Sequence, residues 1–251
     1  MLPDVTLTVD EIVSFINRSS LPTAIIEGDD DVIVYRHLEV IFSNYGLSIL
    51  PVGGRETLLC VFERRAELPN SIPIIFIADR DTWVYGDVPP EFVSQDLIFT
   101  DGYSIENDCF RDGRLDRLMT SAESVLFSDE LGRTIEWYAL ALKRFLDGNE
   151  TKLDIHPNAL LDNEGNFAEQ TTLVNHESYP DELRSLVQSN YTKYLRGKTL
   201  LALLMRQLSY AGRPVRHHHR ALLDVTATDS GPLLSLIFRS VGESLARFDG
   251  R

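Results

Sequence analysis

Residues 72–81 read IPIIFIADRD, and this stretch decides the fold. Its apolar part is continuous and rich in isoleucine, which is typical of a strand covered on both faces of a sheet. Two carboxylates, Asp79 and Asp81, follow directly, and because one residue separates them, an extended chain would place both on the same side. We therefore predict a buried strand over residues 72–79 with acidic residues at its carboxyl end.

The segments on either side of this strand alternate between strand and helix patterns. Further strands are predicted over 23–27, 47–52 and 96–100, and helices over 8–19, 29–46 and 55–68. This alternation predicts an α/β fold with a mostly parallel sheet flanked by helices.

From about residue 114 the pattern becomes helical, which predicts an α/β core over 1–113 and a helical C-terminal region over 114–251. Helices are expected over 114–127, 129–147, 180–189, 190–211 and 231–247. The polar segment 148–179 is expected to be a long loop that could hold a small hairpin.

The composition restricts the class of protein. The chain has 251 residues, 43% of them hydrophobic, and a formal net charge of −14, which argues against a simple nucleic-acid coating role. Cys60 and Cys109 lack zinc-site spacing and are expected to be free thiols. No signal peptide or membrane-length apolar run is recognised, so a cytoplasmic protein without a membrane anchor is expected.

Acidic residues recur where the predicted strands end. Glu27 ends the strand 23–27, Asp31 opens the following helix, and Glu106 follows the strand 96–100. Because the carboxyl ends of parallel strands share one edge of the sheet, these residues are expected to converge with Asp79 and Asp81. Carboxylate oxygens are the ligands that Mg²⁺ prefers.

Four short motifs resemble those of Toprim domains. Residues 27–31 (EGDDD) are similar to the E-G-x-x-D element, and residues 78–81 (ADRD) to the D-x-D element. Residues 100–107 (TDGYSIEN) resemble the S-x-E-N element of Toprim nucleases related to the overcoming-lysogenization-defect enzymes, and residues 196–198 (RGK) a short G-K element. The resemblance is greatest to compact Toprim effectors found beside ABC-type ATPases in bacterial anti-phage systems.

The resemblance implies a Toprim fold and a Mg²⁺- (or Mn²⁺-) dependent endonuclease acting on DNA or tRNA in antiviral defence. Glu27, Asp31, Asp79, Asp81 and Glu106 would then be metal ligands. Glu27 would also act as general acid or base, and Lys198 would stabilise charge on the phosphate. An ABC-type ATPase would be the partner, and the helical tail could form a homodimer interface.

Each of these residues also has a structural interpretation. Acidic residues commonly open helices, Glu106 could start one, and Lys198 could be solvated. The alternative function is a catalytically inactive Toprim-fold binding or regulatory module that acts with an ATPase.

Two further features have open interpretations. The run 213–220 (RPVRHHHR) favours phosphate contact over a metal site, because consecutive histidines do not share one face. Trp83 and Tyr85 could stack on a base or pack inside the protein.

Overall fold

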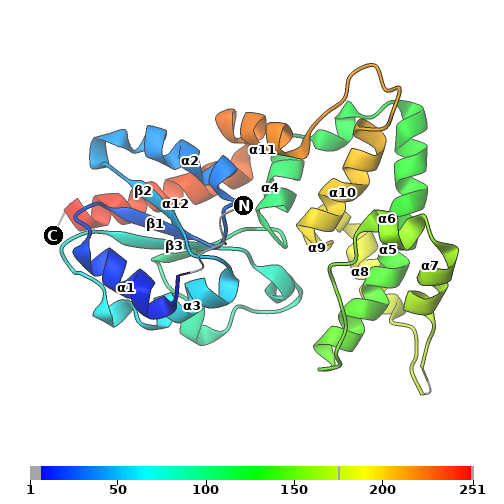
Figure 1. Cartoon of the computed structure of the whole chain (residues 1–251), viewed down its shortest axis with the longest axis horizontal. Helices are drawn as coiled ribbons and strands as arrows, with labels where there is room; N and C mark the ends of the chain where they lie inside the picture. Colours follow the sequence, from blue (N-terminus) through cyan, green and yellow to red (C-terminus); the bar gives the residue numbers. More distant parts are fainter. Residues whose placement is uncertain (1–6, 175, 250–251) are drawn as a thin grey trace. The chain divides into compact units, whose positions relative to one another are not determined.

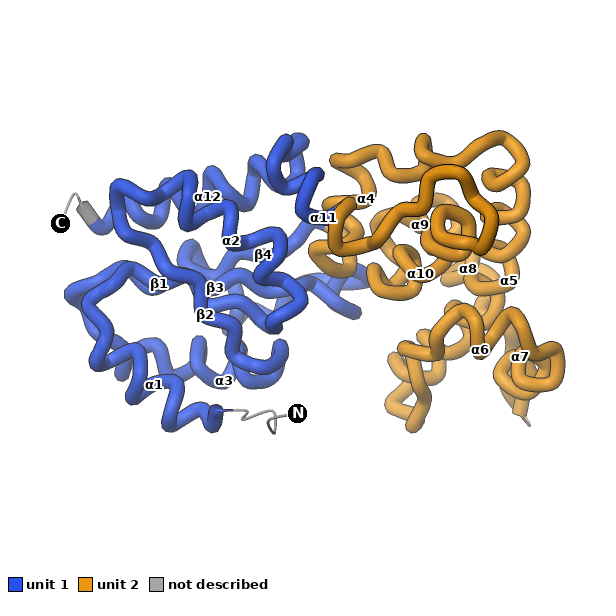
Figure 2. The backbone as a smooth tube through the Cα atoms, turned by 45° about the horizontal axis from the view of Figure 1, so that its top comes forward, with its two compact units in different colours: residues 1–101, 223–251 blue, residues 102–222 orange. Residues whose placement is uncertain are grey.

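The computed structural model describes residues 7–174 and 176–249 (Figure 1). It contains two compact units, residues 1–101 with 223–251 and residues 102–222 (Figure 2). Residues 1–6, on which the expectation of no signal peptide partly rests, lie outside the described residues.

The first unit is built on a parallel sheet. Among the described residues its strands are β1 (Thr23–Ile26), β2 (Ser48–Pro51), β3 (Ile74–Ala78) and β4 (Leu97–Phe99). Their order is β2-β1-β3-β4, and every neighbouring pair is parallel. The predicted α/β fold with a parallel sheet is therefore confirmed. Because the chain moves to β2 on one side of β1 and then to β3 on the other, the order reverses between β1 and β3, where open α/β sheets bind ligands.

Helices cover both faces of this sheet. They are α1 (Val9–Arg18), α2 (Val32–Ile41), α3 (Arg55–Glu63) and α12 (Pro232–Asp249), with 3₁₀ turns η1 (Ser43–Tyr45), η2 (Arg65–Glu67), η3 (Asp81–Tyr85) and η4 (Pro90–Phe92). Figures 1 and 2 show α1 and α3 on one face and α2 and α12 on the other. The start of α1 follows from its sequence, because Thr8 and Glu11 form a capping box.

The last helix, α12, belongs to the first unit. Its buried residues include Leu234, Val241 and Leu245, and the Ser244 hydroxyl donates to the Gln95 carbonyl at 3.4 Å. The compact units therefore do not follow the predicted boundary after residue 113. An amphipathic helix pattern shows that one face is buried, but it does not show which partner buries it.

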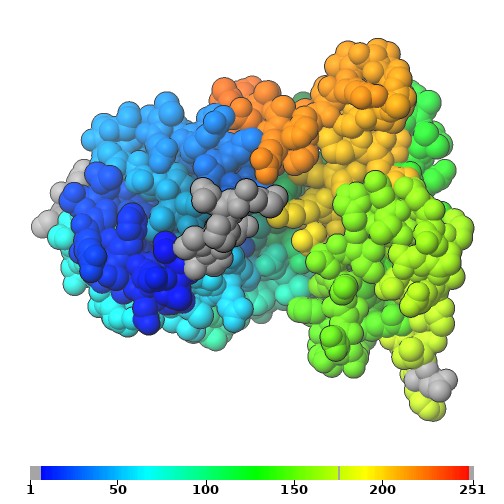
Figure 3. Space-filling model, viewed as in Figure 1, coloured from blue at the N-terminus to red at the C-terminus, as the bar shows by residue number. Residues whose placement is uncertain are grey.

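The second unit is helical, as expected for this part of the chain. It contains α4 (Ile105–Asp112), η5 (Leu115–Leu118), α5 (Ser121–Leu146), α6 (Pro157–Leu161), α7 (Glu164–Thr171), α8 (Asp181–Ser189), α9 (Tyr191–Tyr194) and α10 (Gly197–Leu208). The helix α11 (His219–Thr228) crosses the boundary and belongs to the first unit from Leu223 onward. Figure 3 shows the yellow-green segment of α6 and α7 on the surface.

Several predicted helix boundaries were wrong. The predicted break at residue 128 is absent: Ser128 lies inside the continuous helix α5, where its hydroxyl donates to the Ser124 carbonyl. The predicted loop 148–179 contains α6 and α7, whose N-caps are His156 and Asn163. The predicted helix 190–211 is broken at Leu195, and α11 was not predicted.

No single helix in the described residues has the length and apolar character needed to cross a membrane. The α11–α12 pair reaches that length and composition only when both are taken together across a 61° bend.

Candidate functional site

Glu27 and Asp79 stand at the carboxyl ends of the two central strands. Glu27 follows Ile26 of β1, and Asp79 follows Ala78 of β3. The strands are in parallel register with Ile26 opposite Ile77. The two acidic residues therefore share the carboxyl edge of the sheet, as the sequence predicted, and the strand order places them at its switch point.

A hydrogen bond joins these strand ends. The backbone N–H of Asp79 donates to Oε1 of Glu27 at 2.7 Å. The Glu27 side chain therefore points across the edge of the sheet toward the end of β3. An orientation away from β3 would have separated Glu27 from the D-x-D motif, and the structure does not show it.

The surroundings of Glu27 oppose its negative charge. Burial is the largest influence and raises the pKa of its carboxyl to about 8, while the Asp79 N–H and the Arg55 guanidinium act in the lowering direction. The carboxylates of Asp81 and Asp31 raise the pKa further. Like charges disfavour ionisation, so the Asp31 and Asp81 carboxylates add to the cost of charging Glu27.

The path of the chain through the D-x-D motif differs from the expected one. We predicted an extended Asp79–Asp81 segment with both carboxylates on one side, but β3 ends at Ala78 and Asp81 opens the turn η3. Asp81 has a φ of +48°, in the left-handed region. Few residues other than glycine adopt this conformation, and aspartate is among those that do so more often.

Arg55 holds this turn, and the sequence analysis assigned it no role. Its guanidinium donates to the Asp79 carbonyl and to Oδ2 of Asp81 at 3.3 Å, and it stacks on the Trp83 ring at 4.0 Å. Its buried Nη2 has no hydrogen-bond partner among the described residues. The signal in the sequence was its place at the start of α3, directly after the glycine turn that follows β2.

The glycines before Arg55 are needed for its placement. Gly53 and Gly54 have φ values of +86° and +139°. Residues that have a Cβ rarely adopt such values. The Gly54 N–H donates to the Glu27 carbonyl at 2.7 Å, so the turn is tied to the end of β1.

Asp31 also has a structural role. Its Oδ2 accepts the Gly28 N–H at 3.1 Å, and its own N–H donates to the Gly28 carbonyl at 3.1 Å. It stands just before α2, which begins at Val32, rather than inside the helix as expected. The carboxylate thus closes the turn between β1 and α2 while lying near Glu27.

Glu106 and Lys198 lie in the second unit, on α4 and α10. Glu106 is 6% exposed, and one of its oxygens accepts the Ser104 hydroxyl at 2.5 Å. Lys198 is exposed in the first turn of α10. A Cβ on Gly197 would stand 2.0 Å from Ser104 Oγ, so the S-x-E-N and R-G-K motifs pack against each other.

Asn107 ties the same two motifs together. Its Oδ1 accepts the Ser104 N–H at 3.0 Å, and its Nδ2 donates to the Leu195 and Thr192 carbonyls, each at 2.9 Å. The motif asparagine therefore has a positioning role that the sequence analysis did not assign.

Trp83 packs inside the first unit. Its ring stacks on Phe92 with centroids 5.3 Å apart and meets Phe99 edge-on at 5.7 Å. Together with the Arg55 contact, these neighbours support the packing interpretation over base stacking.

The donor set suits a hard cation, although it does not form a complete cage. In residues 7–174 and 176–249 no three or more His, Cys, Asp or Glu side chains are grouped so that they could hold a metal. Mg²⁺ usually needs only one or two protein carboxylates, with water and substrate phosphate completing its shell. Crowded carboxylates that raise the pKa of Glu27 would gain from a nearby cation.

Comparison of the chain with protein-family models gave no match, and comparison with curated protein sequences gave none either.

Proposed function

We propose that the chain is a Mg²⁺- or Mn²⁺-dependent endonuclease of the Toprim type that hydrolyses phosphodiesters in DNA or tRNA. The observation that carries the proposal is the placement of Glu27. It lies at the β1–β3 switch point, accepts the Asp79 N–H, and lies in the field of Asp31 and Asp81.

The carboxylates have distinct roles in this proposal. One or two of the carboxylates of Glu27, Asp79 and Asp81 would hold the divalent ion directly, with Asp31 nearby, and water and substrate phosphate would complete its shell. The bound ion supplies Lewis-acid polarisation of the phosphate and a more acidic water. Without a metal ion the pKa of the Glu27 carboxyl is raised to about 8, and a bound cation would favour its ionised form, in which it can act as a ligand or as a general base. A role for Glu106 at a second metal and for Lys198 on the phosphate stays a prediction from the motif resemblance.

A cleavage assay tests the proposal directly. The full chain is incubated with plasmid DNA and with tRNA, in Mg²⁺, Mn²⁺ or EDTA, beside Glu27→Ala and Asp29→Ala. We expect divalent-dependent cleavage by the wild type and by Asp29→Ala, because Asp29 is exposed and has no role in the proposed site. Glu27→Ala should lose roughly 10²-fold or more of the rate.

Two results would contradict the enzyme. One is equal cleavage by the wild type and Glu27→Ala. The other is cleavage that persists in EDTA, because the proposed site acts only through a divalent ion.

We propose further that the nuclease is an anti-phage effector acting with an ABC-type ATPase. The support is the motif resemblance and the net charge of −14, because a strongly acidic chain attracts a partner with a basic surface. Co-expression with a candidate ABC-type ATPase should yield a stable complex in which cleavage is restrained. Unrestrained cleavage in that complex would contradict this part of the proposal.

A second candidate function is a regulatory module without turnover. The observation that favours it is the ion pair of Arg55 with Asp81, which places an internal cation among the carboxylates. Titration calorimetry separates the two. Mg²⁺ binding that is lost in Glu27→Ala supports the enzyme, and absence of Mg²⁺ binding in the wild type favours the module.

A further inference from the structure

One stretch of this acidic chain contains only basic charges. Residues 183–223 include no Asp or Glu, although the whole chain has 38. The stretch has eight Lys and Arg residues and three of the six histidines. All but its last residue belong to the second unit.

The loop 209–218 within this stretch is held in place by its own side chains. Arg213 forms an ion pair with Glu123 at 2.8 Å and donates to the Leu118 carbonyl at 2.9 Å. The His217 N–H donates to the Leu208 carbonyl at 3.0 Å and closes the base of the loop. Arg213 is thus used for structure, while Arg216 remains exposed. A preorganised loop loses little entropy when it binds a ligand.

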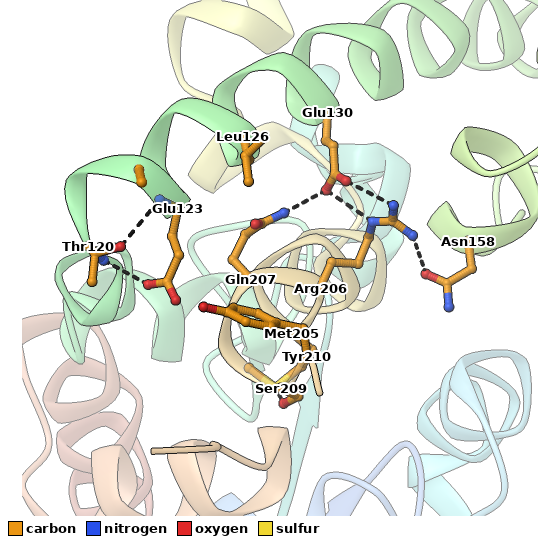
Figure 4. A pocket seen from close by; sticks show the side chains of 11 residues that line it. Thr120, Glu123, Leu126, Glu130, Asn158, Met205, Arg206, Gln207, Ser209 and Tyr210 are labelled. Atoms are coloured by element: carbon orange, nitrogen blue, oxygen red, sulfur yellow. Dashed lines mark hydrogen bonds and ion pairs between the residues drawn. The ribbon is translucent and has the colours of Figure 1, made fainter. Parts of the chain in front are cut away.

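A pocket of about 590 Å³ adjoins this loop inside the second unit (Figure 4). Its lining side chains come from α5, α6, the end of α10 and the turn that follows α10. Leu126 and Tyr210 line it and are 56% and 46% exposed. The volume lies within the range of small-molecule sites and is ample for one nucleobase.

The acidic residues of the pocket are already compensated. Glu123 pairs with Arg213. Figure 4 shows Glu130 accepting hydrogen bonds from both Arg206 and Gln207, each at 2.8 Å. These bonds hold the Glu123 and Glu130 side chains in place, and the arginine charges reduce the repulsion that the two carboxylates would exert on a phosphate. They leave the ring of Tyr210 as the large exposed aromatic surface of the pocket.

Tyr210 and Arg216 are linked through the backbone. Arg216 Nε donates to the Tyr210 carbonyl at 3.2 Å. An exposed aromatic ring and an exposed guanidinium therefore lie within one short loop. Proteins that bind single strands combine these two elements, because the ring stacks on an unpaired base and the cation meets the backbone.

We propose that this pocket and the loop 209–218 form a binding site for single-stranded nucleic acid. One unpaired base stacks on Tyr210, and the adjoining phosphate contacts Arg216. The nature of the ligand rests on the proposed nuclease function, which needs a nucleic-acid substrate, while the site itself is separate from the carboxylates around Glu27.

Binding is measured by fluorescence anisotropy with a short labelled single-stranded oligonucleotide and a duplex of the same sequence. The full chain is used in EDTA, so that no cleavage occurs and the carboxylate site is not required. We expect tighter binding of the single strand. Tyr210→Ala should weaken it about tenfold, whereas Tyr210→Phe, which keeps the ring, should bind as the wild type does.

Arg216→Ala should weaken binding. It should also make the negative slope of log affinity against log salt concentration less steep by about one. Arg239→Ala is the matched control, because Arg239 is also an exposed arginine, 68% exposed, but lies on α12 of the first unit. It should leave both values unchanged.

The site is overturned if Tyr210→Ala or Arg216→Ala binds the single strand as tightly as Arg239→Ala does, or if the duplex binds as well as the single strand. Thermal melts check that each variant is folded. Glu27→Ala separates this outcome from the proposed function, because it should lose cleavage while keeping single-strand binding.

Discussion

Glu27 is held in a charge state that the free side chain would not prefer. Burial raises the pKa of its carboxyl from 4.5 to about 8, and the Asp81 and Asp31 carboxylates add to the shift. An acid whose pKa is higher in the folded state destabilises that state above its unfolded pKa. The cost begins near pH 4.5, grows as pH rises toward 8, and is then constant.

Glu27→Gln should therefore stabilise the protein in EDTA at pH 8 and have little effect at pH 4.5. Glutamine keeps an oxygen for the Asp79 N–H and removes the charge. Thermal melts at both pH values measure the difference. Added Mg²⁺ should raise the melting temperature of the wild type but not of the variant, and an equal rise in both would show that Glu27 is no ligand.

Some features of the candidate site could be predicted from the sequence and others could not. The spacing of Glu27 and Asp79 predicted their meeting, because parallel strands place their carboxyl ends along one edge. The left-handed turn at Asp81 was not predictable, since only a small fraction of aspartates adopt that conformation and no local pattern marks this one. The role of Arg55 depends on that turn, so it followed only from the structure.

At the scale of elements, prediction succeeded where one local rule decides the outcome. The buried strands β1 and β3 were placed within two residues, and the helix predicted over 8–19 begins within one residue of α1. It failed where tertiary contacts decide. Leu195 interrupts a helical pattern because its carbonyl accepts the Asn107 amide, a contact between residues far apart in sequence.

The packing of α10 on α4 gives a prediction at this scale. A Cβ at Gly197 would clash with Ser104 Oγ at 2.0 Å and with Asn107 Oδ1 at 2.7 Å. Gly197→Ala should therefore destabilise the second unit by about 1–3 kcal/mol, as overpacking does.

Gly132→Ala in α5 is its matched control, because a Cβ there meets nothing within 4 Å. This variant should gain about 0.5–1 kcal/mol, as alanine favours a helix interior. Urea unfolding measures both changes. A neutral Gly197→Ala would show that the two motifs are not tightly packed.

At the scale of the whole molecule, the chain returns to its starting unit. The sequence showed a helical pattern over 231–247 but not which surface it covers, so the predicted boundary fell after residue 113. The sheet needs helices on both faces, and α12 supplies part of the cover beside α2. Gly242 of α12 packs against Phe42, because a Cβ added at Gly242 would lie 3.0 Å from the Phe42 ring. This contact joins two segments that are far apart in the sequence.

The dependence of the first unit on α12 is the prediction that belongs to this scale. Leu245 is fully buried on α12, whereas Leu236 on the same helix is 47% exposed. Leu245→Ala should cost about 2–5 kcal/mol through the cavity it leaves, and Leu236→Ala less than about 0.5 kcal/mol. Urea unfolding of the full chain measures both. A fragment of residues 1–113 should fail to unfold cooperatively, because one face of its sheet loses α12. Cooperative unfolding of that fragment, together with equal stabilities of the two leucine variants, would show that α12 is dispensable and that the predicted boundary is a true domain limit.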